Sequence, residues 1–192
     1  MPSFRFEKCV IAAVLFAMLI FFQGGLSAAP LEGGFASAPR ASATPEEKAA
    51  AFREARFRVI VDACKYERTP YRQGGVSKSG FDCSGFVYLS FYDALGVSVP
   101  RYSESLFQWA EEISIEEALP GDLLFFRTTS AGNISHVGIY LGSGRFIHAA
   151  SEGSRTGVIY SNLNESYWTR TYAGAGRALP VANMDIKTEK IN

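Results

Sequence analysis

One cysteine and the two histidines of the chain are the residues whose types and spacing point most clearly to chemistry. Cys83 stands in the segment F-D-C-S-G, just before an apolar run with the periodicity of a buried helix. Asp82 suits the N-cap of that helix, which places Cys83 in its first turn. The unpaired N–H groups and the positive helix end there favour a thiolate over a thiol. Cys83 is therefore a candidate nucleophile, and the alternative is a small buried residue that closes the start of the helix.

The two histidines are predicted to meet on one β-hairpin. His136 begins the run H-V-G-I-Y-L, and His148 lies in F-I-H-A after the turn 142–144. With a three-residue turn, Gly138 faces His148, and His136 lies two residues along the same strand face. Such diagonal neighbours are ~7 Å apart at the backbone, within reach of two imidazole side chains. Gly138 leaves room for the rings, whereas a turn shifted by one residue would separate their faces.

Together these side chains suit nucleophilic catalysis. A thiol, an imidazole base and a second polar group that orients the base form the arrangement that activates a cysteine nucleophile. Zinc is the rival use of the same residues, with Cys83, His136 and His148 as ligands and Asp82 as the fourth. Closely spaced ligand pairs such as C-x-x-C are absent from the sequence, which favours catalysis over zinc.

The elements that position these residues are predicted as helices first and strands second. Thr44 and Glu47 form a capping box for a helix that runs to about Lys65, and the Cys83 helix ends at Gly96. A short helix is predicted at 104–111, followed by strands at 123–126, 136–141 and 146–149 and near 156–160 and 172–178. This order is typical of the α+β class with an antiparallel sheet.

The ends of the chain are predicted to lie outside this domain. Arg5 and Lys8 precede an apolar stretch at 9–22 and then small residues, so residues 1–28 resemble a signal peptide. An uncleaved membrane anchor is the alternative, although a span needs ~20 apolar residues. Residues 29–43, rich in Ala, Gly, Ser and Pro, are predicted to be a flexible linker. The domain is predicted at 44–180 and a frayed tail at 181–192.

The balance of charge excludes one class of partner. The chain has 19 basic and 19 acidic side chains, so no net charge draws it to nucleic acid or anionic lipid. No phosphate-binding glycine loop and no basic-aromatic run is present in the sequence either. The 47% of hydrophobic residues is typical of one domain with a core.

Several motifs in order resemble the NlpC family, papain-like bacterial peptidases that act on cell-wall peptides. They are F-D-C-S-G-F-V, the P-R pair at Pro100-Arg101, L-P-G-D-L-L-F-F, S-H-V-G-I-Y-L-G and F-I-H-A, within about residues 54–179. The resemblance implies a papain-like α+β fold with N-terminal helices packed on a central antiparallel sheet. It also implies Cys83 as nucleophile, His136 as base and His148 as the residue that orients His136.

The resemblance implies a substrate as well. Tyr71 matches a tyrosine beside the nucleophile, and Asp82 and Ser84 match positions that line the subsite for the amino end of a stem peptide. We expect an endopeptidase of peptidoglycan stem peptides that cuts the D-glutamyl–diamino acid bond. Cleavage of cross-links, acyl or amide transfer and an inactive wall-binding domain are the alternatives. No metal or cofactor is implied, and we expect a monomer, exported to the periplasm or cell surface and associated with the wall.

Export would leave Cys64 and Cys83 as two cysteines in an oxidising compartment, where a disulfide could join them. A bond between them would remove the nucleophile. We therefore expect both to be free thiols, with Cys64 on the buried face of the first helix.

Overall fold

Helices pack against a six-stranded antiparallel sheet in the computed structural model, which describes residues 44–151, 153 and 155–179. The strands of the sheet lie in the order β3-β8-β4-β5-β6-β7, and a separate hairpin, β1-β2, precedes α3. The helices are α2 (Pro45–Lys65), α3 (Cys83–Leu95), α4 (Ser103–Trp109) and α5 (Ser166–Thr171). The strands are β1 (Val76–Ser77), β2 (Gly80–Phe81), β3 (Glu111–Ile113), β4 (Leu123–Phe126), β5 (His136–Gly142), β6 (Arg145–Ala150), β7 (Gly157–Asn162) and β8 (Tyr172–Arg177). The predicted α+β class is confirmed.

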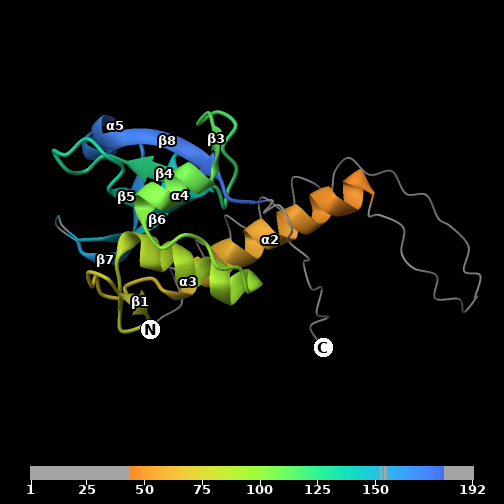
Figure 1. Ribbon diagram of the computed structural model, residues 1–192, viewed down its shortest axis with the longest axis horizontal. Helices are drawn as coiled ribbons and strands as arrows, with labels where there is room; N and C mark the ends of the chain where they lie inside the picture. The colour runs from red at the N-terminus through yellow and green to blue at the C-terminus, as the bar shows by residue number, and fades with distance from the viewer. Residues whose placement is uncertain (1–43, 152, 154, 180–192) are drawn as a thin grey trace, which may run out of the picture.

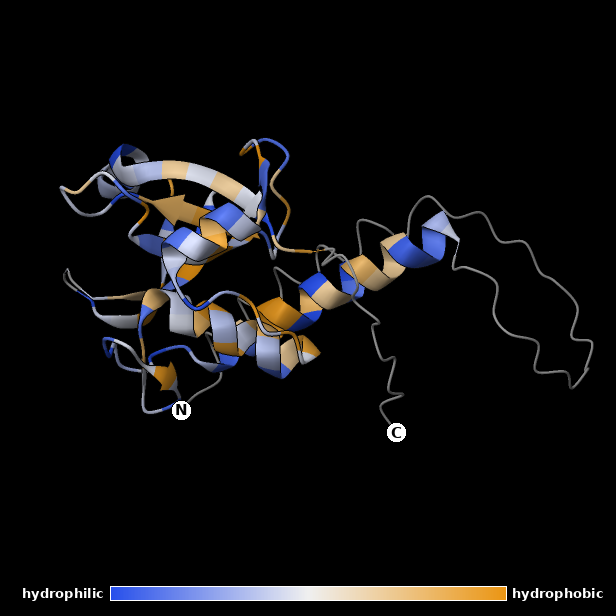
Figure 2. Cartoon of the chain, in the orientation of Figure 1, coloured by the Kyte–Doolittle hydropathy of each residue, from blue (hydrophilic) through white to orange (hydrophobic). Residues whose placement is uncertain are grey.

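The sheet has a core cluster on each face. In β4, Leu123 and Phe125 belong to the cluster shared with α2 and α3, whereas Leu124 and Phe126 belong to the second cluster, which contains Trp168 of α5. All four β4 side chains are fully buried, and the strand is among the most hydrophobic parts of the chain in Figure 2. The helices α2 and α3 lie together on one side of the sheet, and α5 lies on the other (Figure 1).

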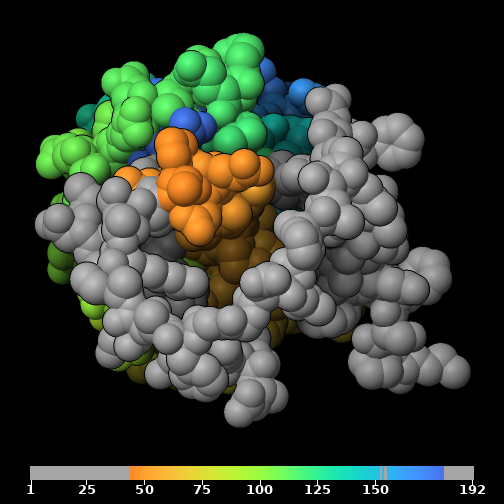
Figure 3. Space-filling view, turned by 90° about the vertical axis from the view of Figure 1, so that its right-hand side faces the viewer, coloured from red at the N-terminus to blue at the C-terminus, as the bar shows by residue number. Residues whose placement is uncertain are grey.

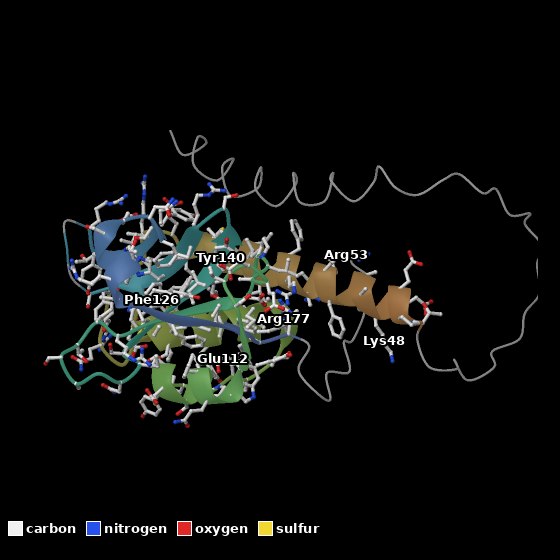
Figure 4. All side chains as sticks on the ribbon, turned by 90° about the horizontal axis from the view of Figure 1, so that it is seen from above. Lys48, Arg53, Glu112, Phe126, Tyr140 and Arg177 are labelled. Atoms are coloured by element: carbon white, nitrogen blue, oxygen red, sulfur yellow. The ribbon has the colours of Figure 1, made fainter. Side chains whose placement is uncertain are left out.

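The first helix begins as predicted and then extends beyond the body of the domain. Thr44 Oγ1 accepts the N–H of Glu47, and the Glu47 carboxylate accepts the N–H of Thr44, which completes the capping box. Residues 44–50 are exposed, and this end of α2 stands out toward the viewer in Figure 3. Lys48 points away from the helix there, whereas Phe126 lies within the body of the domain (Figure 4). Only the second half of α2 therefore packs on the domain.

A buried ion pair fastens this second half to the sheet. Arg56, which is 5% exposed, donates to Asp122 at 2.6 Å and to the carbonyl of Leu179 at 3.2 Å. Asp122 is fully buried and also accepts from Arg177 of β8 at 3.2 Å. Two elements that are distant in sequence, α2 and β8, thus bind one carboxylate just before β4.

The β5–β6 hairpin contains a bulge that the sequence did not predict. Ser143 and Gly144 both have positive φ and form a two-residue turn, so Gly142 pairs with Arg145. The predicted three-residue turn is therefore wrong. The register shifts at Leu141, and from Tyr140 onward the predicted pairing is restored. The predicted strand faces are consequently correct despite the different turn.

Four short elements were not predicted, namely β1, β2, β3 and α5, and one helix was predicted too long. The predicted helix 104–111 ends at Trp109, and Glu111 instead begins β3, which pairs with β8. Pairing with the sheet edge outweighs the helix propensity of the Glu-Glu pair. Helix α5 was not predicted, because its six residues are too few to show a helical period.

The predicted signal peptide, linker and C-terminal tail lie outside the described residues. Among residues 44–179, apart from 152 and 154, no helix has both the length and the apolar character needed to cross a membrane.

We expect the substitution Arg56→Ala to destabilise the domain, because the buried carboxylate of Asp122 then keeps only Arg177 as a cationic partner. Removal of one partner from a buried pair costs about 3 kcal/mol, whereas Arg58→Ala, at an exposed position of the same helix, should change the free energy of unfolding by less than about 0.5 kcal/mol. Urea unfolding of both variants measures the difference. Equal costs for the two variants would contradict the anchoring role of Arg56.

Candidate active site

The candidate nucleophile lies where the start of α3 meets the start of β5. Cys83 is the first residue of α3, and the N-cap residue Asp82 accepts the N–H of Gly85 at 2.7 Å. The Cys83 sulfur accepts the backbone N–H of Val137 and lies 3.9 Å from the carbonyl oxygen of Ser135. These are the two neighbours of His136 in the chain, so the structure brings the thiol against the backbone that carries the candidate base.

The thiol itself differs from the sequence expectation. Burial, and after it the charge of the nearby Asp82 carboxylate, raise the pKa of Cys83 to about 11. The N–H groups of Val137, Ser84 and Cys83 act in the opposite direction but do not offset these effects. A thiolate stabilised by the helix start was therefore the wrong expectation, because desolvation and the charge of the N-cap outweigh the helix end.

The two histidines meet as predicted. His136 Nε2 lies 2.9 Å from His148 Nδ1, with the rings nearly perpendicular at 86°. A side chain on Gly138 would come within 3.2 Å of His148 Cβ and 2.8 Å of Phe146, so this position must be small. Since Nε2 of His136 bonds to His148, Nδ1 is the ring nitrogen that can face Cys83.

An aromatic cage keeps the two imidazoles dry and neutral. Trp168 stacks on His136 at a centroid distance of 5.3 Å and meets His148 edge-on at 4.8 Å, and Phe126 and Phe146 complete the contacts. Burial lowers the pKa of His136 to about 4 and holds the pKa of His148 well below 6.5. Since the Cys83 thiol is protonated as well, neither the thiol nor His136 is charged at pH 7 before the reaction.

A serine completes the row of hydrogen bonds. Ser161 Oγ of β7 lies 3.0 Å from His148 Nε2. Neither Ser161 nor Trp168 was given a role from the sequence, although both lie within the stretch that resembles the family. A serine within a strand carries no signal of its own, whereas Trp168 is one of two tryptophans in the chain.

The predicted substrate residues surround the start of α3. Arg101 donates to both carboxylate oxygens of Asp82, at 2.8 and 2.7 Å, and to Ser84 Oγ at 2.8 Å. The N–H of Gly74 also donates to Asp82, at 2.9 Å. Burial raises the pKa of Tyr71, and the nearby Cys83 and Asp82 add to this effect. Arg101 was part of a quoted motif, but its pairing with Asp82 was not predicted.

The rival zinc site finds no support in this geometry. Within the described part of the chain, no three His, Cys, Asp or Glu side chains are grouped so that they could hold a metal ion. The nitrogens of His136 and His148 that face each other are at hydrogen-bond distance instead.

The expectation for the two cysteines is half correct. Cys83 is a free cysteine and is partly exposed. Cys64 is 7% exposed on the buried face of α2, as predicted, but it is disulfide-bonded, although not to Cys83. A free thiol at Cys64 was therefore a wrong prediction.

The buried neutral imidazoles should make folding depend on pH. Since the folded pKa of His136 is lowered from 6.5 to about 4, the unfolded chain binds a proton more readily between these values. The stabilisation is fully present above pH 6.5 and is lost as the pH falls toward 4, by roughly 3 kcal/mol for His136. Urea unfolding at pH 7.5 and 4.5 should show a smaller pH effect in His136→Gln than in the wild type. An identical pH effect in both proteins would contradict a buried neutral His136.

The sequence of this chain is similar to those of several known proteins. The chain is 41% identical over 113 residues to the murein DD-endopeptidase MepH of Escherichia coli, covering 57% of this chain and 41% of the relative. It is 36% identical over 126 residues to the murein DD-endopeptidase MepS/murein LD-carboxypeptidase of the same organism, covering 66% and 64%. It is 43% identical over 122 residues to the gamma-DL-glutamyl hydrolase of Bacillus subtilis, covering 62% and 28%. The chain thus spans less than two thirds of the length of each of these relatives.

Solved structures agree with the sequence matches. A lipoprotein-like NLP/P60 protein of Staphylococcus aureus aligns with a TM-score of 0.57 and 39% identity, over 65% of this chain and 41% of that one. An NlpC/P60 family protein of Bacillus cereus aligns with a TM-score of 0.56 and 33% identity, over 65% and 40%. The profile of the NlpC/P60 family matches residues 68–177, which contain Cys83 and both histidines. This chain belongs to the NlpC/P60 family.

Proposed function

We propose that this protein is an exported cysteine endopeptidase that hydrolyses amide bonds in peptidoglycan stem peptides. The observation that carries the proposal is the free thiol of Cys83 at the start of α3, held against the strand start that bears the buried His136–His148 pair. The names of three relatives, two murein endopeptidases and a gamma-DL-glutamyl hydrolase, agree with this substrate class.

In the proposed first step, Cys83 attacks the carbonyl carbon of the scissile amide while His136 Nδ1 takes the thiol proton. A carbon–sulfur bond forms and the carbonyl electrons move to oxygen. Because the resting thiol has a pKa of about 11 and the resting imidazole a pKa of about 4, His136 acts as a general base during attack and no ion pair forms beforehand.

The intermediate then collapses with the help of the same groups. The backbone N–H of Cys83 and the hydroxyl of Tyr71 stabilise the oxyanion. His136 gives its proton to the leaving amine as the carbon–nitrogen bond breaks. It next takes a proton from water, whose oxygen attacks the acyl carbon of the acyl-enzyme. The carbon–sulfur bond then breaks, the carboxylic acid product leaves, and His136 returns the proton to the Cys83 sulfur. His148 orients His136 through the 2.9 Å hydrogen bond.

The substrate subsite in this proposal is formed by Tyr71, Asp82 and Ser84. Because Arg101 bonds to Asp82 and Ser84, these side chains are held in one orientation beside Cys83. The D-glutamyl–diamino acid bond of the stem peptide is the proposed target. Cleavage of the cross-link between stems is the second candidate, and the relatives MepH and MepS, which are named murein DD-endopeptidases, favour it.

The proposed setting follows from the ends of the chain. Residues 1–28 would direct export and residues 29–43 would tether the peptidase domain, which acts in the periplasm or outside the cell at the wall. The enzyme works as a monomer without metal or cofactor in this proposal. Acyl or amide transfer by the same residues would instead yield a transferred peptide product, and an inactive wall-binding domain would yield no product.

Mass spectrometry of defined stem peptides tests the activity. We expect the wild type to cleave a monomeric tripeptide at the D-glutamyl bond, or a cross-linked dimer at the cross-link, and Cys83→Ala to cleave neither because the nucleophile is absent. The melting temperature of Cys83→Ala should remain close to that of the wild type. Hydrolysis by the alanine variant would contradict Cys83 as nucleophile.

Alkylation of Cys83 tests the resting state of the thiol. Since the pKa of Cys83 is about 11, its reaction with iodoacetamide should stay slow at pH 7 and accelerate above pH 9. Peptide mapping by mass spectrometry follows Cys83 itself, with Cys83→Ser as the unreactive control. A rate that already reaches its plateau below pH 7 would reveal a preformed thiolate–imidazolium pair and overturn the general-base step.

A further inference from the structure

His148 has a hydrogen-bond partner on each ring nitrogen. Nδ1 lies 2.9 Å from His136 Nε2, and Nε2 lies 3.0 Å from Ser161 Oγ. His148 is fully buried and Ser161 is 6% exposed. In the β6–β7 pairing, Phe146 faces Ser161 and His148 faces Ile159, so Ser161 is a diagonal neighbour of His148 on the same sheet face. The hydroxyl therefore stands at the end of a buried row that starts at His136.

The positions of the protons along this row decide whether His136 can serve as a base. If His148 carries its proton on Nε2, it donates to Ser161 and accepts the Nε2–H of His136, which leaves a lone pair on His136 Nδ1. In the reverse arrangement Ser161 donates, His148 donates from Nδ1, and His136 carries its proton on Nδ1. Only the first arrangement presents a basic nitrogen on the side that can face Cys83.

The need for a proton on Nε2 of His148 is stricter once His136 is protonated during the reaction. Once His136 has taken the thiol proton, both of its ring nitrogens carry hydrogen, so Nε2 must donate to His148 Nδ1. His148 must then carry its own proton on Nε2. A buried N–H without an acceptor is costly, and Ser161 Oγ is the acceptor that the structure provides at this position.

We propose that Ser161 is a positioning residue, whose hydroxyl accepts the Nε2–H of His148 and maintains the tautomer that allows His136 to act as a base. This inference rests on the proposed role of His136. A hydroxyl suits the position because it is neutral. A carboxylate in its place would draw a proton onto the two imidazoles, whose burial keeps their pKa values low and the resting pair uncharged.

Nitrogen-15 spectra of the histidine rings test the tautomer without any substrate. The chain has two histidines, so His148→Gln assigns the four ring signals. In the wild type at pH 7 we expect a proton on Nε2 of His148 and none on its Nδ1. In Ser161→Ala this pattern should be lost in favour of Nδ1–H, because no hydroxyl remains to accept. A wild-type proton on Nδ1, or an unchanged pattern in Ser161→Ala, would overturn the proposal.

Kinetics on a cleaved stem peptide provide the second measurement. We expect Ser161→Ala to lower kcat by about 10-fold to 100-fold with little change in KM, because it removes orientation and not substrate contact. Ser161→Thr retains the hydroxyl and should recover most of the loss in kcat and the wild-type tautomer. Equal losses in the threonine and alanine variants would contradict a role for the hydroxyl.

Ser90→Ala is the matched control. Ser90 is a fully buried serine of α3 whose hydroxyl donates to the carbonyl of Phe86 at 2.8 Å, away from the imidazoles. Its loss should leave both the tautomer of His148 and kcat unchanged. If Ser90→Ala lowers kcat as much as Ser161→Ala does, the loss in Ser161→Ala reflects the removal of any buried hydroxyl and the proposal is contradicted. If the wild type cleaves no stem peptide, the proposed function fails, and the ring spectra still decide the role of Ser161.

Discussion

The contact between two uncharged imidazoles inside an aromatic cage is the interaction on which the rest of the site depends. His136 and His148 come from different strands, and their rings meet only if both strands present the correct face. The bulge at Leu141 meets this requirement, because it restores the register that the two-residue turn would otherwise shift by one residue. Gly138 then supplies the space between the strands. A small irregularity of the backbone thus determines whether a base can be oriented at all.

Electrostatics in the site are governed more by exclusion of water than by formal charge. The helix start at Cys83 would favour a thiolate in an open position, yet burial and the carboxylate of Asp82 keep the thiol protonated. That carboxylate is in turn balanced by Arg101, so the segment before the nucleophile is charged but paired. Burial likewise keeps the histidines neutral. Charge is therefore expected to develop during reaction, in surroundings that are already organised.

Much of the fold could be predicted because the deciding signals are local or periodic. The capping box of α2, the start of α3 and the strands around His136 and His148 follow from residue types a few positions apart. The predicted turn was wrong, whereas the predicted strand faces were correct. The apolar pattern of the strands determines which face is buried, independently of how the turn closes.

What could not be predicted depends on contacts between segments distant in sequence. The pairing of Arg101 with Asp82, the placement of Ser161 beside His148 and the pairing of β3 with the sheet edge have no local signature. The pKa of Cys83 also depends on how deeply the fold buries it, which the sequence of one helix start does not contain. The ion pair between Arg56 and Asp122 is of the same kind, because it joins a helix outside the family match to the residue before β4, within that match.

The position of Trp168 has an optical consequence. The chain has two tryptophans, and Trp109 is 37% exposed while Trp168 is 9% exposed and lies flat against His136. An imidazolium quenches the fluorescence of an adjacent indole more strongly than a neutral imidazole does. In a chain with phenylalanine in place of Trp109, the emission intensity would therefore follow the charge of the two imidazoles that Trp168 contacts. The cage that keeps water from the histidines also makes their protonation visible from outside.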